Sequence, residues 1–284
     1  MNETIKQIQI EHLRPFENFP FQIRHDEQLE LLAESIAMEG IYNPLIVRPL
    51  KKDVYEIISG HRRYEACKMA GVKTIPAIIR EMDKDSAIIA VIDCNMHREF
   101  ILPSEKAFAY KMKLDAMNRQ GKRTDLTFSQ VGKKLNSYET VAKQTGESRS
   151  QIHRYIRLTN LIKPLLDMVD QGRIALSPAV ELSYLSEYEQ EQLVMHINFY
   201  DATPSLSQAI QMRNLSDENL LSDNAIKEIM SERKANQIEY LKMPTDSIRK
   251  FFRPNTTEKQ MQNIILKALA FYNKYQQRQN NKTR

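Results

Sequence analysis

Cysteine and long apolar runs are scarce in this chain of 284 residues. Its two cysteines, Cys67 and Cys94, form no Cys-x-x-Cys pair and stand in no cluster with histidine. This scarcity argues against a disulfide framework and against structural zinc, and it is typical of a reducing compartment. No apolar run approaches the about 20 residues of a membrane-spanning helix. Residues 1–11 also lack the apolar core of a signal peptide. The sequence therefore predicts a cytoplasmic protein that is neither secreted nor embedded in a membrane.

Basic charge is concentrated in one segment, between Arg119 and Leu158. The whole chain has 41 Lys and Arg against 36 Asp and Glu, a formal net charge of +5. The segment alone has nine basic residues against three acidic ones, so the rest of the chain sums to about neutral (5 − 6 = −1). Such clustering is expected of a protein that binds a polyanion. Charge alone leaves open a merely solvated helical surface.

Short strand patterns and two helical patterns alternate in the first hundred residues. Pro76 suggests that its strand lies at the edge of a sheet. Gly40 and Gly71 stand where glycines commonly end helices. The predicted strands are 5–10, 45–47, 54–58 and 75–79, and the predicted helices are 29–36 and 62–69.

From Ser86 onward the pattern is helical. Pro103 opens a helix that we expect to reach about Arg119, and the polar stretch 120–137 predicts a loop beside a short helix. The hydrophilic residues 214–223 indicate a boundary. We expect an α+β fold with a small α/β domain over 1–100, a helical domain over 101–213 and a helical C-terminal region over 214–284. Further helices are predicted at 163–171, 177–185, 187–199 and 257–275.

The last predicted helix carries an apolar stripe of Met261, Ile265, Ala268 and Tyr272. This stripe is typical of a dimerisation helix and equally of one helix in a small core.

The segment Tyr138–Leu158 has the pattern of a helix-turn-helix. A small residue, Ala142, falls where the two helices cross, and Gly146 falls in the turn, where a positive φ is needed. Ser148 is placed to cap the second helix. Val141, Ile152 and Ile156 supply apolar contacts between the helices. An ordinary helical hairpin with a glycine turn is the alternative.

The second helix of this motif has one apolar side and one polar side, as a recognition helix in the major groove requires. We predict that Arg149 and Gln151 contact base edges, and that Lys143, Arg154 and Arg157 contact phosphates. The predicted DNA-binding residues are Lys143, Ser148, Arg149, Ser150, Gln151, His153, Arg154 and Arg157.

A second candidate site is the run Ser59-Gly60-His61-Arg62-Arg63, where a strand passes through a glycine into a helix. A helix N-terminus offers free N–H groups and a positive dipole end, and arginines form charge-assisted hydrogen bonds with phosphate. Paired arginines at a helix start also serve as surface salt-bridge partners. The run alone does not decide between the two.

Four sequence elements follow one another in a specific order: Phe21-Gln22-Ile23-Arg24, Gly60-His61-Arg62-Arg63, Asn95-Met96-His97-Arg98 and the helix-turn-helix leading into Arg157-Leu158. In this order they resemble the ParB/Spo0J family of DNA partition proteins, over roughly residues 5–185. The resemblance implies CTP and Mg²⁺ binding in the N-terminal domain, and binding of a palindromic centromere-like site in double-stranded DNA. It also implies a homodimeric, nucleotide-gated clamp on DNA, a nucleoid-associated location and a ParA-type partner ATPase. The nucleotide-binding residues that it implies are Gln22, Arg24, Gly60, His61, Arg62, Arg63, Asn95 and Arg98, with Asn95 also at the metal.

Three positions depart from the family pattern. His61 and Cys94 replace two glutamates that the family associates with metal positioning and hydrolysis, and His97 replaces a glutamine. A neutral imidazole and a thiol offer a hard Mg²⁺ no anionic oxygen. We therefore expect nucleotide binding with weak or absent CTP hydrolysis.

Two other functions stay open at this point. One is a transcriptional regulator or nucleoid-associated protein of the same fold without a segregation role. The other is a nuclease or kinase with a ParB-like N-terminal domain. The loss of both glutamates argues against the latter, because phosphoryl transfer relies on a positioned metal and base.

Overall fold

The computed structural model describes residues 5–124, 130–232, 248–253 and 256–280. The chain forms two compact units, Met1–Glu232 and Arg233–Arg284. Within the described ranges, no helix combines the length and the apolar character that a membrane crossing requires.

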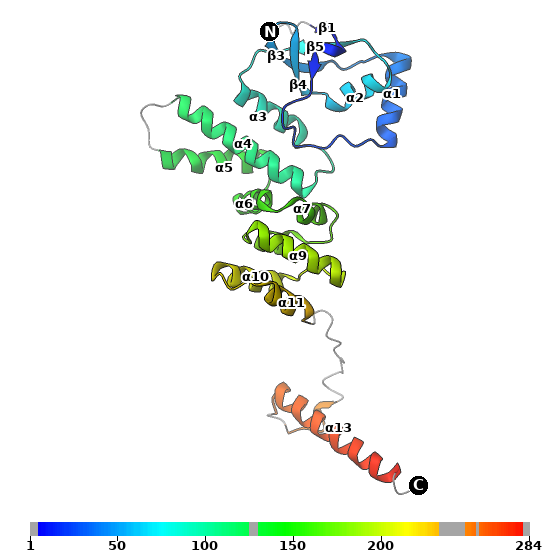
Figure 1. Cartoon of the computed structure of the whole chain (residues 1–284), viewed down its shortest axis with the longest axis vertical. Coiled ribbons are helices and arrows are strands. Elements are labelled where there is room, and N and C mark those ends of the chain that lie inside the picture. Colours follow the sequence, from blue (N-terminus) through cyan, green and yellow to red (C-terminus); the bar gives the residue numbers. More distant parts are fainter. Residues whose placement is uncertain (1–4, 125–129, 233–247, 254–255, 281–284) are drawn as a thin grey trace. The chain divides into compact units, whose positions relative to one another are not determined.

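A five-stranded sheet forms the N-terminal part of the first unit, with strand order β1-β5-β3-β4-β2 (Figure 1). The strands are β1 (Ile5–Gln9), β2 (Leu13–Arg14), β3 (Leu45–Lys51), β4 (Val54–Ser59) and β5 (Thr74–Ile79). The predicted α/β part, and with it the α+β fold class, is confirmed.

The predicted edge position of the proline-containing strand is wrong. Strand β5 lies between β1 and β3, antiparallel to the former and parallel to the latter. The pairing with β3 begins at Leu45↔Ala77, one residue beyond Pro76. Pro76 therefore lies outside that ladder, and its missing N–H is tolerated inside the sheet.

Helices cover both faces of the sheet because its side chains alternate in direction along each strand. Leu45 and Val47 pack in one core with α1 (Glu27–Glu39) and α2 (His61–Met69). Ile46 and Ile58 pack in another core with α3 (Lys84–Asn95). Helix α1 is capped by the Asp26 carboxylate, which accepts the Leu29 N–H at 3.0 Å.

The long helix α4 (Pro103–Thr124) belongs to two cores at once. Ala109 and Ala116 pack with α3 beneath the sheet, whereas Tyr110 and Leu114 pack with α5 (Gln130–Thr145) and α6 (Arg149–Arg157). This one helix therefore joins the α/β part to the helix-turn-helix (Figure 1).

The polar stretch 120–137, predicted to be a loop beside a short helix, is largely helical. Helix α4 continues to Thr124 and α5 begins at Gln130, while 125–129 lie outside the described residues. Gly121 and Gly132 each lower helix propensity by about 1 kcal/mol. The lysines, arginines, glutamines and leucine around them are good helix formers and outweigh that cost.

The rest of the first unit is a stack of short helices around one apolar core. Its helices are α7 (Lys163–Asp170), α8 (Leu176–Leu182), α9 (Glu187–Tyr200), α10 (Leu206–Asp217) and α11 (Asp223–Ser231). The stretch expected to mark a boundary begins inside α10. Ile226 and Ile229 of α11 join the same core as Leu193, so the first unit extends to Glu232.

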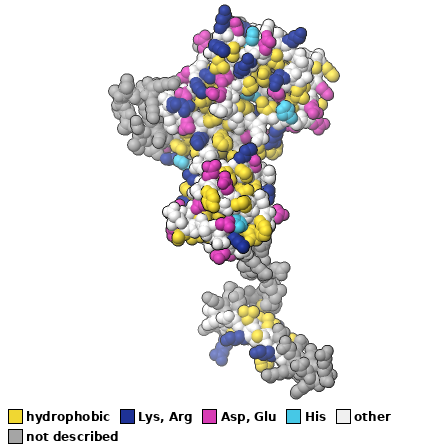
Figure 2. Space-filling view, in the orientation of Figure 1, with side chains coloured by type: hydrophobic (Ala, Val, Ile, Leu, Met, Phe, Trp, Pro, Cys, Tyr) yellow, Lys and Arg dark blue, Asp and Glu magenta, His cyan; other side chains and the backbone are white. Residues whose placement is uncertain are grey.

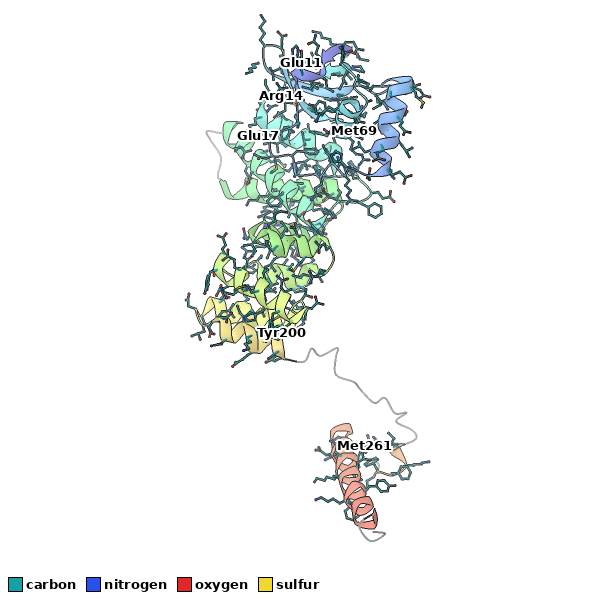
Figure 3. The ribbon with its side chains drawn as sticks, turned by 45° about the vertical axis from the view of Figure 1, so that its right-hand side comes forward. Glu11, Arg14, Glu17, Met69, Tyr200 and Met261 are labelled. Atoms are coloured by element: carbon teal, nitrogen blue, oxygen red, sulfur yellow. The ribbon has the colours of Figure 1, made fainter. Side chains whose placement is uncertain are left out.

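The second unit contains α13 (Glu258–Asn280), in agreement with the helix predicted at 257–275. Met261, labelled in Figure 3, is buried, whereas Leu266, Phe271 and Tyr272 are exposed. Dimerisation through this helix stays a prediction.

Basic and acidic side chains are interspersed over the face of the first unit seen in Figure 2, with hydrophobic groups between them. No broad field of one sign covers the described residues on that face. The electrostatics of each site therefore depend on individual side chains.

Candidate nucleotide and DNA sites

Gly60 makes the turn from β4 into α2. Its backbone is left-handed, with φ 102° and ψ 24°. A Cβ atom at this position would lie 2.9 Å from Cγ of Leu45. Only glycine satisfies both the dihedral angles and the contact. The turn places His61, Arg62 and Arg63 at the N-terminus of α2.

Three arginines from separate segments converge beside this helix start. Arg62 donates to the carbonyl oxygen of Arg24 at 3.3 Å and to Oδ1 of Asp26 at 2.8 Å. Burial lowers the pKa of Arg98, the nearby Glu105 carboxylate raises it, and the positive charges of Arg62 and Arg24 lower it again. Arg62 and Arg98 are half-buried, Arg24 is exposed, and the three charges lie close enough for Arg62 and Arg24 to repel Arg98. Such a cluster favours a bound anion.

The segment from β2 to α1, which contains Arg24 and Asp26, is fixed at several points. Arg14 donates to the carbonyl oxygen of Glu11 at 2.5 Å, and Glu17 pairs with Lys84 at 2.7 Å. Figure 3 labels Arg14 and Glu17 in this segment and Glu11 just before it. The Glu17 N–H also donates to Oε1 of Glu56 at 3.3 Å. The segment is therefore held to the sheet and to the start of α3.

Glu105, which the sequence did not single out as a site residue, holds Gln22 in the same region. Its Oε1 accepts the Gln22 N–H at 2.6 Å, and its Oε2 accepts the Leu102 N–H at 2.8 Å. The carboxylate is buried. The second of these bonds is half of a capping box at the start of α4. A Glu two residues after Pro103 was the available signal.

His61 is an interior residue rather than an exposed ligand of the arginine cluster. Its ring stacks on Phe19 with centroids 3.8 Å apart, and Nε2 accepts the Phe16 N–H at 3.4 Å. Burial, and then the charge of Arg98, lower the pKa of His61 to about 3. The ring is therefore neutral near pH 7, with its proton on Nδ1.

Arg63 and Asn95, both predicted to bind the nucleotide, make their described contacts within the scaffold. Arg63 donates to the carbonyl oxygens of Asn43 and Pro44, and burial lowers its pKa. The buried Asn95 donates from Nδ2 to the carbonyl oxygen of Val91 at 2.7 Å. Both side chains therefore have contacts within the domain, and their binding of the nucleotide stays a prediction.

The residues around the cluster do not fit a protein-held Mg²⁺. The described part of the chain contains no group of three or more His, Cys, Asp or Glu placed to hold a metal. Asp26 and Glu105 are occupied by Arg62 and by backbone N–H groups. Cys94 is exposed and His61 is neutral. A hard cation prefers anionic oxygens that these residues do not offer.

The helix-turn-helix is confirmed in its local details. Gly146 has φ 71° in the turn between α5 and α6. The Ser148 hydroxyl accepts the Gln151 N–H at 3.1 Å and caps α6. Val141 and Ile152 are fully buried against α4.

The polar side of α6 presents several groups to solvent. Arg149, Ser150 and His153 are exposed, and so are the capping Ser148 and, at the end of α5, Lys143. The rings of His153 and Tyr138 stack at 4.2 Å, and the Arg149 guanidinium lies 5.7 Å from the same Tyr138 ring. Partial burial and the Arg149 charge lower the pKa of His153. Tyr138 is therefore a platform that orients two of the predicted DNA-binding residues.

Two other residues of α6 turn toward α8. Arg154 donates to the Ser177 hydroxyl at 2.6 Å and to the Gln151 side chain at 3.4 Å. Arg157 donates to the carbonyl oxygen of Ser183 at 2.6 Å. Both are half-buried. The predicted set thus separates into an outward group and a group that contacts the neighbouring helix.

Two family models match the chain. Residues 1–96 match the ParB N-terminal domain, and residues 127–203 match the ParB HTH domain. A probable chromosome-partitioning protein ParB of Pseudomonas putida is 33% identical over 201 residues, which is 70% of this chain and 63% of that protein. The stage 0 sporulation protein J of Bacillus subtilis is 36% identical over 175 residues, 61% of this chain and 55% of that protein. The chain thus spans less than two thirds of the length of either relative.

Among solved structures, the chain is similar to the chromosome-partitioning protein ParB of Caulobacter crescentus. In the complex with the centromeric parS site, the likeness covers 75% of this chain and 99% of that one, with 23% identity and a TM-score of 0.42. In the complex with CTP-γ-S, it covers 67% and 99%, with 25% identity and a TM-score of 0.31.

Proposed function

Because this chain belongs to the ParB family, we propose that it acts in DNA partition, binding duplex DNA through α6 and a nucleotide through its arginine cluster. The observation that carries the DNA-binding part is the capped α6, whose apolar side is buried while Arg149, Ser150 and His153 stay exposed. Curated relatives are named as chromosome-partitioning proteins, and partition is the role proposed for this chain.

The proposed DNA contacts come from α6 and the end of α5, and they divide according to the surroundings of each residue. Arg149 and Gln151 lie at the N-terminal end of the helix and are proposed to contact base edges, where bidentate contacts discriminate best. The exposed Lys143 and the half-buried Arg154 are proposed to contact phosphates. Two copies of the chain would read the halves of a palindrome, because a two-fold dimer matches a two-fold site.

The proposed nucleotide site consists of Arg24, Arg62 and Arg98 at the N-terminus of α2. The positive dipole end of α2 and three converging guanidinium groups favour a polyphosphate. CTP is the nucleotide that the family resemblance implies. His61 is neutral, and the Glu105 and Asp26 carboxylates are occupied, so none of these three groups is free to position a metal or to activate water. The proposal is therefore binding with weak or absent hydrolysis, used to gate a dimeric clamp that works with a ParA-type ATPase.

Calorimetric titration of the full chain with CTP, and with the other nucleoside triphosphates, tests the nucleotide site. Arg62→Ala should weaken CTP binding at least tenfold, because a charge-assisted hydrogen bond contributes about 1.5–3 kcal/mol. Lys68→Ala is the matched control, since this exposed lysine is on the same helix and pairs with Glu65. Wild-type protein that binds no nucleotide, with or without DNA, would contradict the site.

Genome-wide occupancy tests the partition role separately. A partition protein should occupy a few clusters of related sites and spread into the flanking DNA. Occupancy scattered over promoters would instead support a regulator of the same fold.

A further inference from the structure

Arg157, at the C-terminal end of α6, lies in a stack that involves two other helices. Its guanidinium carbon is 3.8 Å from the centroid of the Tyr184 ring, just after α8. Nη2 donates to the Ser183 carbonyl oxygen at 2.6 Å, and Nε donates to the Ser183 hydroxyl at 3.2 Å. This guanidinium is therefore fixed in both position and plane.

A second guanidinium, that of Arg213 on α10, lies 3.7 Å from the same Tyr184 centroid. Two groups this close to one centroid occupy opposite faces of the ring, because on one face they would overlap. Arg213 also pairs with Oε2 of Glu181 at 2.8 Å and with Asp217 at 3.6 Å. Arg157, Tyr184 and Arg213 thus form a three-layer stack, called here the brace, whose positive charge is offset by two carboxylates.

The brace acts together with an apolar contact at the same end of α6. Leu158, the next residue, is fully buried in the core that contains Ala209 and Met212 of α10. Each cation–π contact contributes about 0.5–2 kcal/mol depending on its exposure, and the planar guanidinium of arginine suits such stacking better than lysine does. The C-terminal end of α6 is therefore tied to α8 and α10 by polar and apolar contacts.

Helix α10 lies beyond residue 203, where the match to the ParB HTH domain ends. One layer of the brace therefore comes from outside the matched domain. Arg149 and Arg157 are eight residues apart on α6, about 12 Å along the axis. A tilt of about 5° at the braced end would move the Arg149 end by about 1 Å, which is enough to break a hydrogen bond to a base edge.

We propose that the brace sets the angle of α6 and that Tyr184 and Arg213 are positioning residues for specific DNA binding. Arg157 serves the brace rather than a phosphate contact. This inference rests on the proposed DNA-binding role of α6. It gives α10, outside the matched domain, a part in sequence recognition.

The test compares binding to two DNA duplexes of equal length. The recovered duplex is the one that the full-length wild-type protein selects by binding from a random-sequence library, and the unrelated duplex has a different sequence. Tyr184→Leu and Arg213→Ala should each lower affinity for the recovered duplex about fivefold, the equivalent of about 1 kcal/mol. Affinity for the unrelated duplex should stay within about twofold, because it depends on phosphate contacts. Tyr184→Phe keeps the ring and should bind like the wild type. All titrations are run below the unfolding transition of each variant.

Salt dependence separates the brace from a phosphate contact. Arg157→Ala should weaken specific binding while leaving the slope of log K against log salt unchanged. A slope reduced by about 0.9 would show that Arg157 neutralises a phosphate and would overturn its assignment. The positioning role would be overturned if Tyr184→Leu and Arg213→Ala bound the recovered duplex as tightly as the wild type does. It would also be overturned if they lost affinity equally for both duplexes. A wild-type protein that enriches no duplex would instead contradict the proposed DNA-binding function.

Discussion

The arginine cluster at the start of α2 and the exposed side of α6 use similar side chains in opposite ways. Around α2, Arg63, His61 and Asn95 are engaged by the protein itself. Arg24, Arg62 and Arg98 face one another there, and Arg62 also pairs with Asp26. Along α6, by contrast, the residues predicted to read bases sit on or near the surface.

This difference follows from the size of the proposed ligand. A small polyanion gains most from charges held in a partly buried place, where screening is weak. DNA is large and rigid, so its contacts must project from a surface and be supported from below. Substitutions of buried residues around α2 should therefore lower the free energy of unfolding. Substitutions on the exposed side of α6 should instead lower the affinity for DNA.

The largest contrast is expected between two glycines with positive φ. Gly60→Ala combines backbone strain with a Cβ placed 2.9 Å from Leu45 and should lower the free energy of unfolding by about 3 kcal/mol. Gly146→Ala meets no atom within 4 Å and should cost about 1 kcal/mol from strain alone. Urea unfolding of both variants measures the gap. Equal costs would show that the α2 turn is no more constrained than the turn before α6.

Arg149→Ala should weaken binding to the recovered duplex by about 2 kcal/mol, about 30-fold, because a base-edge contact is lost. The free energy of unfolding should hardly change, since the side chain is exposed. Titration by fluorescence anisotropy measures the affinity, with the exposed Lys227→Ala of α11 as control. A loss of stability without a loss of affinity would reverse the contrast between the two regions.

His61 predicts an acid sensitivity of the α2 region. Its pKa is lowered from 6.5 to about 3 in the folded state, so its contribution to stability is complete above pH 6.5 and is lost as the pH falls toward 3. Between pH 7 and pH 5 this loss is about 2 kcal/mol. His61→Gln keeps an acceptor for the Phe16 N–H and should remove the loss, whereas the exposed His25→Gln should retain it. Urea unfolding at both pH values decides the matter.

Ser148→Ala should have the smallest effect, about 1 kcal/mol of stability, because one N–H at the start of α6 loses its cap. DNA affinity should fall with it, while CTP affinity stays unchanged. Thermal unfolding and parallel titrations test this. A change in CTP affinity would mean that the α6 cap also supports the arginine cluster.

The helix-turn-helix could be predicted because its requirements are local. The crossing residue Ala142, the turn at Gly146 and the cap at Ser148 lie close together, and each has a direct physical reason. The arginine cluster could not be derived in this way, because Arg24, Arg62 and Arg98 meet only after the chain folds. Only the family resemblance brought them together.

The missed features share a dependence on distant partners. Glu105 acts through Gln22, and Tyr184 acts between Arg157 and Arg213, contacts that no local pattern encodes. The wrong prediction that the strand with Pro76 lies at the edge of the sheet has the same origin. The register of the neighbouring strand decides whether the missing N–H of Pro76 matters. The prediction of a loop at 120–137 relied on the polar composition of this stretch. It was wrong because many of these polar residues are also good helix formers.

Helix α4 packs against α3 on one side and against α5 and α6 on another. The two candidate sites thus share one helix, and we expect a ligand bound at one site to shift that helix at the other. Such coupling is reciprocal. If a bound nucleotide changes the affinity for DNA by some factor, bound DNA changes the affinity for the nucleotide by the same factor. Measuring either factor fixes the other.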